Sequence, residues 1–197
     1  TDREALDPDF VIVRSDGEPV FHLVNVIDDL EMRITHVIRG VDHQVNTAFQ
    51  LALYHALGAT PPQFAHVPLI VGANGKKLSK RRDPVSVQHY RDEGYLPAAM
   101  RNWLLRLGWS HGDQEIFSKH EIVQLFNLTS ISRSPAQADL GKLPWLNQQY
   151  LKTIPMPELF QTLQPFYRRS LGRDLPQTRD LEKILDLLRD RARSLPE

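Results

Sequence analysis

Apolar residues along the first forty positions are grouped in short runs that predict strands. The runs Phe10–Arg14 and Pro19–Val24 flank the turn-forming pair Asp16-Gly17, and this arrangement predicts a β-hairpin. A further strand is predicted over Thr35–Gly40, because the run is rich in β-branched residues. The N-terminal part of the chain is therefore expected to contain a sheet.

The spacing of apolar residues changes to a helical period after residue 43. Apolar positions recur at intervals of three and four from His43 to Leu57, with Asn46-Thr47 as the expected N-cap and Gly58 as the stop. The run His66–Val71 then predicts another strand. Strand, helix and strand in this order are typical of part of a nucleotide-binding α/β unit.

Beyond residue 84 the periodicity is helical throughout, so the predicted fold class is α/β followed by all-α. Pro97 suits the first position of a helix, and Ser118 with Glu121 forms a capping box. Helices are predicted over residues 85–91, 97–107, 118–126, 139–150, 156–171 and 179–193. In the second of these helices the expected core residues are Met100, Leu104, Leu105 and Leu107.

Composition excludes several classes of protein. The 197 residues carry 24 Lys and Arg against 24 Asp and Glu, so contact with nucleic acid has to come from local patches. The absence of cysteine excludes disulfides and thiolate zinc sites, and no run of 18 apolar residues predicts a membrane span. The chain begins with neither methionine nor a signal peptide, and we expect that both of its ends are cut.

The strongest concentration of charge is the segment Asn74–Arg82, which holds five cations and a hydroxyl directly after an apolar run. Asn74-Gly75 favours positive φ and a tight turn, which leaves the lysines on a loop that can fold over a polyphosphate. The alternative is a solvated basic face or an electrostatic footprint for nucleic acid.

Arg39 stands at the carboxyl end of a predicted strand, the edge at which open α/β sheets bind ligands. Its planar guanidinium suits a carboxylate. The alternative is an arginine paired with Asp28 or Asp29.

Several histidines invite a metal interpretation, and the spacing argues against it. None of the pairs among His36, His43, His55 and His66 combines an i, i+4 spacing on one helix with a glutamate base. No protein-bound metal is predicted.

The order of residues in the basic loop resembles a known signature. Lys77-Leu78-Ser79-Lys80-Arg81 is similar to the second signature of class I aminoacyl-tRNA synthetases, in the form typical of bacterial glutamyl-tRNA synthetases. Further blocks resemble the same family in the same order, and they include Phe21–Asp29, Ile34–Gly40, Asp42-His43, Ala65–Leu69, Gly94–Pro97, Leu107–Ser110 and Trp145–Asn147.

This resemblance implies an organisation and a set of partners. It implies the second half of a Rossmann-like catalytic domain over residues 1–83, a helical stem-contact domain over 84–152 and the start of a helical anticodon-binding domain over 153–197. The implied substrates are glutamate, tRNA(Glu) and ATP with Mg²⁺. The implied setting is the cytoplasm, without a membrane, and the implied state is a monomer when full length.

The resemblance also assigns roles to individual positions. Arg39 matches the family arginine that binds the side-chain carboxylate of glutamate, Asn25 and Phe21 match the amino-acid pocket, and Asp42 matches an acidic position near the adenylate. Lys80 matches the catalytic lysine that contacts the ATP phosphates and stabilises the departing pyrophosphate, and Lys77, Ser79 and Arg81 are implied to help in ATP binding.

Departures from the family pattern leave alternatives open. Phe21 stands where tyrosine is usual, Val41 replaces a glutamate, and Ala48-Phe49 replaces Pro-Arg. A His-x-Gly-His signature is missing from the sequence, so we expect a fragment of a ligase that is inactive alone. A non-catalytic tRNA-binding paralogue and an unrelated nucleotidyl-transferring enzyme that shares the lysine loop are the alternatives.

Overall fold

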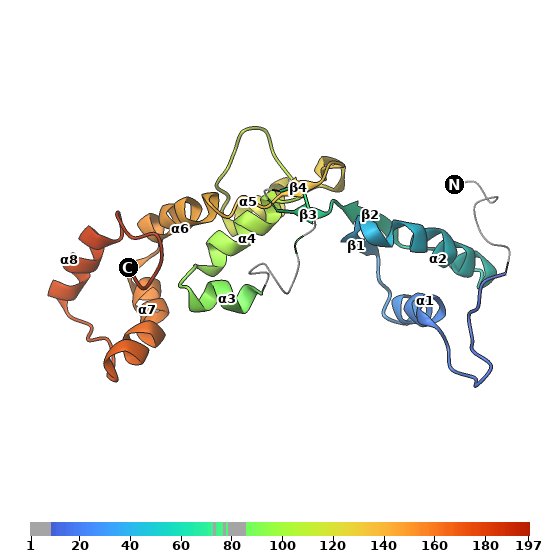
Figure 1. Ribbon diagram of the computed structural model, residues 1–197, viewed down its shortest axis with the longest axis horizontal. Coiled ribbons are helices and arrows are strands. Elements are labelled where there is room, and N and C mark those ends of the chain that lie inside the picture. Colours follow the sequence, from blue (N-terminus) through green and yellow to red (C-terminus); the bar gives the residue numbers. More distant parts are fainter. Residues whose placement is uncertain (1–8, 73, 77, 79–85) are drawn as a thin grey trace. The chain divides into compact units, whose positions relative to one another are not determined.

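A computed structural model describes residues 9–72, 74–76, 78 and 86–197. The described chain divides into two compact units, one comprising residues up to 69 with 131–134 and the other residues 70–130 with 135–197 (Figure 1). The first unit holds α1 (Phe21–Glu31), β1 (His36–Gly40), η2 (Val41–His43), α2 (Gln44–Ala56) and β2 (Gln63–Val67). The second holds β3 (Ile70–Val71), α3 (Val87–Asp92), α4 (Pro97–Arg106), α5 (Lys119–Leu125), η3 (Leu128–Ser130), β4 (Ala136–Gln137), α6 (Lys142–Thr153), α7 (Met156–Leu171) and α8 (Arg179–Leu188).

The first unit is built on a parallel strand pair connected by a helix. β1 and β2 pair in parallel with Arg39 opposite His66, and α2 forms the crossover between them. α1 packs on α2, and the small core between them contains Val26, Leu53 and Tyr54. The predicted strand, helix and strand order is therefore confirmed for this part of the chain.

The hairpin predicted over residues 10–24 is wrong in its second half. The backbone turns at Gly17, whose φ is +88°, and pairs only through a single antiparallel bridge between Val13 and Pro19. Residues from Phe21 onward form α1 instead of a strand. Val26 and Leu30 are spaced by four residues and pack against the α2 core, and this burial outweighs the strand propensity of the local sequence.

The strand predicted over His66–Val71 is two separate strands. β2 ends at Val67, and β3 pairs in parallel with β4 in the second unit. Pro68 lies at the break and has no N–H to donate to a ladder, which accounts for the interruption.

The predicted N-cap of α2 is also wrong. The helix begins at Gln44, and His43 occupies the N-cap position without a side-chain hydrogen bond. Asn46 instead bonds to the ring of His43, and the hydroxyl of Thr47 is engaged by Arg39. The predicted stop is confirmed, because Gly58 adopts a φ of +64° directly after the helix.

The second unit is largely helical, as predicted. α4 begins at Pro97 and α5 begins with the capping box of Ser118 and Glu121. α6 starts at Lys142, three residues later than predicted, because Asp139 accepts hydrogen bonds from the backbone N–H groups of Gly141 and Lys142. α8 ends at Leu188, five residues before the predicted end.

Two apolar cores stabilise this unit. One lies between α4 and α6 and includes Met100, Trp103 and Leu146, while the other joins the start of α4 to α6, α7 and the C-terminal segment. Leu104, predicted to be buried, is 44% exposed, because Trp103 occupies the inward position of that helical turn.

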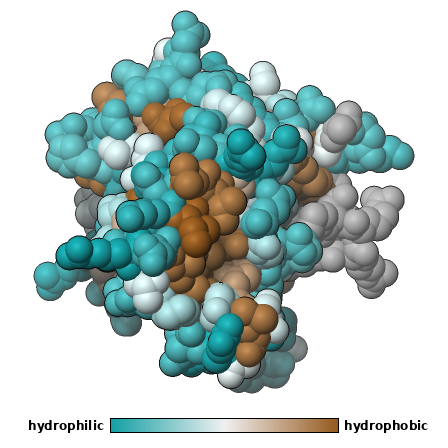
Figure 2. All heavy atoms as spheres, turned by 90° about the vertical axis from the view of Figure 1, so that its left-hand side faces the viewer, coloured by the Kyte–Doolittle hydropathy of each residue, from teal (hydrophilic) through white to brown (hydrophobic). Residues whose placement is uncertain are grey.

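The α7 and α8 end of the second unit presents an apolar patch (Figure 2). The exposed apolar side chains of these helices are Leu171, Ile184, Leu187 and Leu188.

Within the described residues, none of the helices has the length and the apolar character that crossing a bilayer requires.

Candidate functional site

Arg39 is held in place at the carboxyl end of β1 by two neutral side chains. Its Nη2 donates to the hydroxyl of Thr47 on α2 at 2.8 Å, and its Nε points at Nε2 of His66 on β2 at 3.5 Å. Thr47 and His66 are themselves 3.2 Å apart, and the guanidinium carbon lies 5.3 Å from the ring centroid of Phe64. The guanidinium is thus oriented by three uncharged neighbours.

The sequence left open a pairing of Arg39 with Asp28 or Asp29. The hydrogen bonds of the guanidinium go to Thr47 and His66, and Asp29 acts on it through its charge. Burial lowers the pKa of Arg39, and Asp29 opposes this shift. Burial raises the pKa of Asp29 itself, and the charge of Arg39 opposes that shift.

Two imidazoles near Arg39 favour the neutral form. Burial lowers the pKa of His66, and the charges of Arg39 and His43 lower it further. Burial also lowers the pKa of His22, and Arg39 again adds to the shift. Near neutral pH the guanidinium is therefore the positive group of this cluster, and an anionic ligand meets one localised charge.

Asn25 and Phe21 lie one helical turn apart on α1. Asn25 accepts a hydrogen bond from Gln50 of α2 at 3.0 Å, which leaves its own amide N–H groups as donors for a ligand. Phe21 is 52% exposed, and its ring meets that of His22 edge to face. The same helix carries His22 and Asp29, which both sense the charge of Arg39.

Asp42 lies in η2, immediately after the strand that carries Arg39. A Cβ at Gly40 would lie 2.5 Å from Oδ1 of Asp42, so only glycine lets this carboxylate fold back over the end of β1. The sequence thus places Arg39 and Asp42 at the same strand end.

The turn that opens the basic loop is confirmed. Gly75 has a φ of +72°, Gly72 donates to the carbonyl of Lys76 at 2.9 Å, and the backbone N–H of Lys76 donates to the side chain of Asn74 at 3.0 Å. Leu78 packs against the α4 and α6 core. The remaining predicted residues of the loop, Lys77, Ser79, Lys80 and Arg81, lie outside the described residues.

Sequence reasoning missed the residues that orient Arg39. Thr47 was expected only as part of a helix N-cap and His66 received no role in the site, although the pairing of the two strands in parallel follows from the predicted strand, helix and strand order. Gln50, which is 1% exposed and holds Asn25, was also missed, because nothing local marks a glutamine as buried. In the described part of the chain no three His, Asp or Glu side chains are grouped closely enough to hold a metal ion.

Comparison with known proteins gives a consistent result. Residues 2–145 match the family described as tRNA synthetases class I (E and Q), catalytic domain. The chain is 53% identical over 189 residues to a glutamate–tRNA ligase of Nitrosomonas europaea, covering 96% of this chain and 41% of that protein. It is 51% identical over 196 residues to a glutamate–tRNA ligase of Coxiella burnetii, covering all of this chain and 41% of the relative.

Solved structures agree with these relatives. A glutamate tRNA ligase from Elizabethkingia meningosepticum, crystallised in complex with its amino acid, matches with a TM-score of 0.82 and 35% identity over 98% of this chain and 42% of that one. The glutamate-tRNA synthetase of Elizabethkingia anophelis matches with a TM-score of 0.79, also at 35% identity, over 95% of this chain and 41% of that one. The chain therefore spans about two fifths of the length of the relatives it matches, and it belongs to the family of class I tRNA synthetases for glutamate and glutamine.

Proposed function

We propose that this chain supplies the amino-acid-binding part of a glutamate–tRNA ligase, an enzyme that activates glutamate with ATP and transfers it to tRNA(Glu). The observation that carries the proposal is the guanidinium of Arg39, which is oriented by neutral Thr47 and His66 at a strand end. The names of the relatives at 51–53% identity support the same reaction.

In this proposal Arg39 binds the side-chain carboxylate of glutamate. A guanidinium whose hydrogen-bond partners are neutral keeps donors for an anion, and its fork donates hydrogen bonds to two carboxylate oxygens. Asn25 supplies amide donors to the same substrate, and Phe21 covers it with an apolar ring. Asp42 is proposed to lie near the adenylate.

The proposed chemistry is attack of the glutamate α-carboxylate on the α-phosphate of ATP, which forms glutamyl-adenylate and releases pyrophosphate. No protein nucleophile is required, so positioning and charge neutralisation provide most of the acceleration. Lys80 is proposed to stabilise the charge of pyrophosphate as it departs, with Lys77, Ser79 and Arg81 assisting ATP binding. Magnesium is proposed to arrive with ATP, held by phosphates and water.

The remaining segments receive roles in tRNA binding. We assign residues 1–83 to the catalytic domain, 84–152 to a stem-contact domain and 153–197 to the start of an anticodon-binding domain. The enzyme is proposed to act in the cytoplasm as a monomer, with the missing signature His-x-Gly-His contributed by the rest of the full-length protein.

The test is glutamate-dependent ATP–pyrophosphate exchange, with tRNA present, in the full-length protein that contains this chain. Arg39→Gln leaves the carboxylate without its partner, and the expected loss in kcat/KM for glutamate is about 2–5 kcal/mol, or roughly 30-fold to several thousand-fold. Lys80→Ala is expected to lower kcat. Arg14→Gln, an exposed charge in the same unit, is the matched control and is expected to behave as the parent.

Two results would overturn the proposal. An unchanged KM for glutamate in Arg39→Gln would remove the role of the guanidinium. Absence of any exchange in the full-length parent, together with intact tRNA binding, would identify a non-catalytic paralogue.

A further inference from the structure

The second unit contains a pocket of about 160 Å³ between α4 and the start of α6. Among the residues that line it are Trp103, Arg106, Glu115, Asp139, Lys142 and Trp145. Aromatic rings and charges of both signs therefore border the same small volume.

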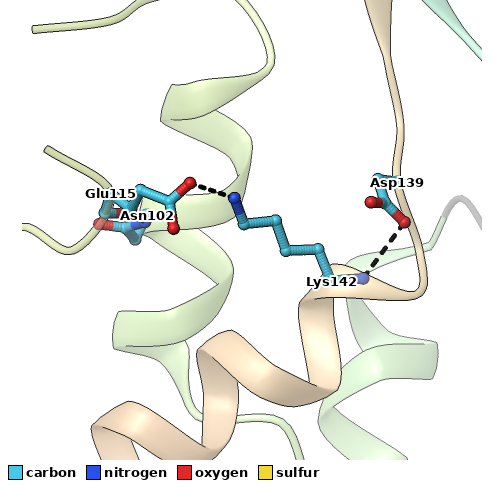
Figure 3. Close-up of polar contacts among 4 residues, drawn as sticks. All are labelled: Asn102, Glu115, Asp139 and Lys142. Carbon is cyan, nitrogen blue, oxygen red and sulfur yellow. Dashed lines mark hydrogen bonds and ion pairs between the residues drawn. The ribbon is translucent and has the colours of Figure 1, made fainter. Parts of the chain in front are cut away.

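The acidic side of the pocket is held in place by its surroundings. The ammonium of Lys142 forms an ion pair with the Glu115 carboxylate, while the backbone N–H of Lys142 donates to Asp139 at 3.2 Å (Figure 3). Asn102 donates to the Glu115 carbonyl at 2.8 Å and so fixes the backbone beneath this carboxylate. The hydrogen bond from Lys142 lowers the pKa of Glu115, so the carboxylate is an acceptor at neutral pH.

The basic side of the pocket has an unmet donor. Nη1 of Arg106 is buried and has no hydrogen-bond partner among the residues that the structure describes. A buried N–H without an acceptor is costly, so a ligand that brought an acceptor to this guanidinium would be favoured.

The aromatic side offers a surface for stacking. Trp145 is 39% exposed where it lines the pocket, and Nζ of Lys142 lies 5.6 Å from its ring centroid. Planar bases stack on such side chains when they are turned out of a strand.

We propose that this pocket binds a single unpaired guanine base. The base stacks on Trp145, Arg106 donates to its O6 or N7, and the Glu115 carboxylate accepts from its N1–H and exocyclic amino group. Lys142 then leaves Glu115 and pairs with the adjoining phosphate. Adenine presents an amino donor where guanine presents O6 and lacks the N1–H, so it fits this donor and acceptor pattern poorly.

The base comes from an RNA strand, and this part of the inference rests on the proposed function. The preference for guanine over adenine is independent of the proposed function, because it follows from the donors and acceptors of the pocket alone. The two are separated by testing a free nucleotide and an oligonucleotide side by side.

The first experiment titrates the 197-residue chain with GMP and AMP while recording the indole N–H signals of its three tryptophans by NMR. GMP is expected to shift the Trp145 signal saturably and to bind at least about tenfold more tightly than AMP. The Trp145 signal is identified by its disappearance in Trp145→Phe. Equal binding of both nucleotides, an unmoved Trp145 signal, or the same shift with inorganic phosphate would each overturn the proposal.

Variants sharpen the assignment. Arg106→Gln and Glu115→Gln are each expected to weaken GMP about tenfold and to leave AMP unchanged. If the spectrum of Arg106→Gln loses its dispersion, which would mean that this variant does not fold, Glu115→Gln provides the test. Arg101→Gln, an exposed arginine on the same helix, is the matched control and is expected to bind GMP as the parent does. Unchanged GMP binding in both pocket variants would exclude the pocket.

The second experiment identifies the source of the base. A short oligouridine with one central guanosine is expected to bind at least about tenfold more tightly than GMP, because the neighbouring phosphates add contacts. Binding no tighter than that of GMP would overturn the assignment to RNA. Neither outcome depends on ligation, so a failure of the Arg39 experiment leaves this one interpretable, and the reverse also holds.

Discussion

The two units differ in how their buried amide side chains are satisfied. In the helical unit Asn102 and Asn147 are fully buried and each has its amide donor and acceptor satisfied, Asn102 by the backbone of Glu115 and Phe117. In the α/β unit the buried Oε1 of Gln50 and Nδ1 of His22 have no partner among the described residues.

This difference distinguishes buried polar groups that stabilise packing from those that are available to a ligand. A buried amide whose donor and acceptor are both hydrogen-bonded fixes the packing around it, because any rearrangement would leave its partners without a hydrogen bond. A polar substrate would supply hydrogen bonds to buried groups that lack a partner in the same unit as an oriented arginine. In the helical unit Nη1 of Arg106 and Nε1 of Trp109 are also buried without a partner among the described residues, and of these two side chains Arg106 lines the pocket described above.

The largest expected effect on stability is that of Asn147→Ala. The side chain accepts from the N–H of Leu96 at 2.8 Å and donates to the carbonyl of Arg193 at 2.7 Å, and truncation leaves a buried N–H and a partly buried carbonyl unpaired. The expected loss in the free energy of unfolding is about 3 kcal/mol. All three tryptophans lie in the helical unit, so their fluorescence in a urea titration reports this unit alone.

The neighbouring Gln148→Ala is the control for that experiment. Gln148 also bonds to carbonyls of the C-terminal segment, those of Asp190 and Arg191, but in an exposed setting where water can replace it. Its loss is expected to cost below about 1 kcal/mol. Equal losses in the two variants would show that burial of the amide is not what matters.

A second effect concerns the glycine that the C-terminal segment covers. Gly94 has a φ of +87°, and an added Cβ would meet Pro196 and lie 2.8 Å from the backbone nitrogen of Leu195. Gly94→Ala is expected to lower the unfolding free energy by about 2–3 kcal/mol through backbone strain and steric overlap. Gly112 also has a positive φ, but a Cβ added there would meet open space. Gly112→Ala is therefore expected to lower the unfolding free energy by about 1 kcal/mol, through backbone strain alone. Urea titration of both variants measures the difference, and similar losses would mean that the overlap relaxes.

In the α/β unit the expected effects appear in activity more than in stability. Thr47→Val removes the hydroxyl that accepts from Arg39, and the KM for glutamate in the full-length protein is expected to rise about tenfold. Thr47→Ser keeps the hydroxyl and is expected to restore the parent value. An unchanged KM in Thr47→Val would show that Arg39 is oriented without it.

The smallest expected effect is a pH dependence of the α/β unit. Burial and Arg39 lower the pKa of His66 in the folded state, so on acidification below about pH 6.5 the unfolded chain binds a proton first. Stability is therefore complete above that pH and is lost as pH falls toward the folded-state pKa. Hydrogen exchange of the β1 and β2 amides is expected to show this slope, and His66→Gln to flatten it. A slope that persists in the variant would assign the effect to His22.

Local signals predicted most of the framework. The β-branched run before Gly40, the helix that ends before Gly58 and the capping box at Ser118 were all confirmed, because each depends on neighbours in sequence. Propensity failed for α1, where packing of Val26 onto α2 decided the structure.

Sequence reasoning proposed Arg39, Asn25 and Phe21 as binding residues and missed the side chains that orient Arg39. Arg39 was found by its place at a strand end, whereas Thr47 and His66 become its partners only through the β1 and β2 register and the crossover helix. The predicted strand included Phe21 and ended before Asn25, whereas the structure places both residues on α1. Such contacts between distant residues have no local sequence signature.

The register of β1 against β2 makes the site sensitive to chain length as well as to chemistry. Side chains alternate between the two faces of a strand, so deleting one residue inside β1 would turn Arg39 toward the opposite face while every residue of the cluster remained present. Insertions between α2 and β2 would leave the pairing, and with it the orientation of the arginine, unchanged.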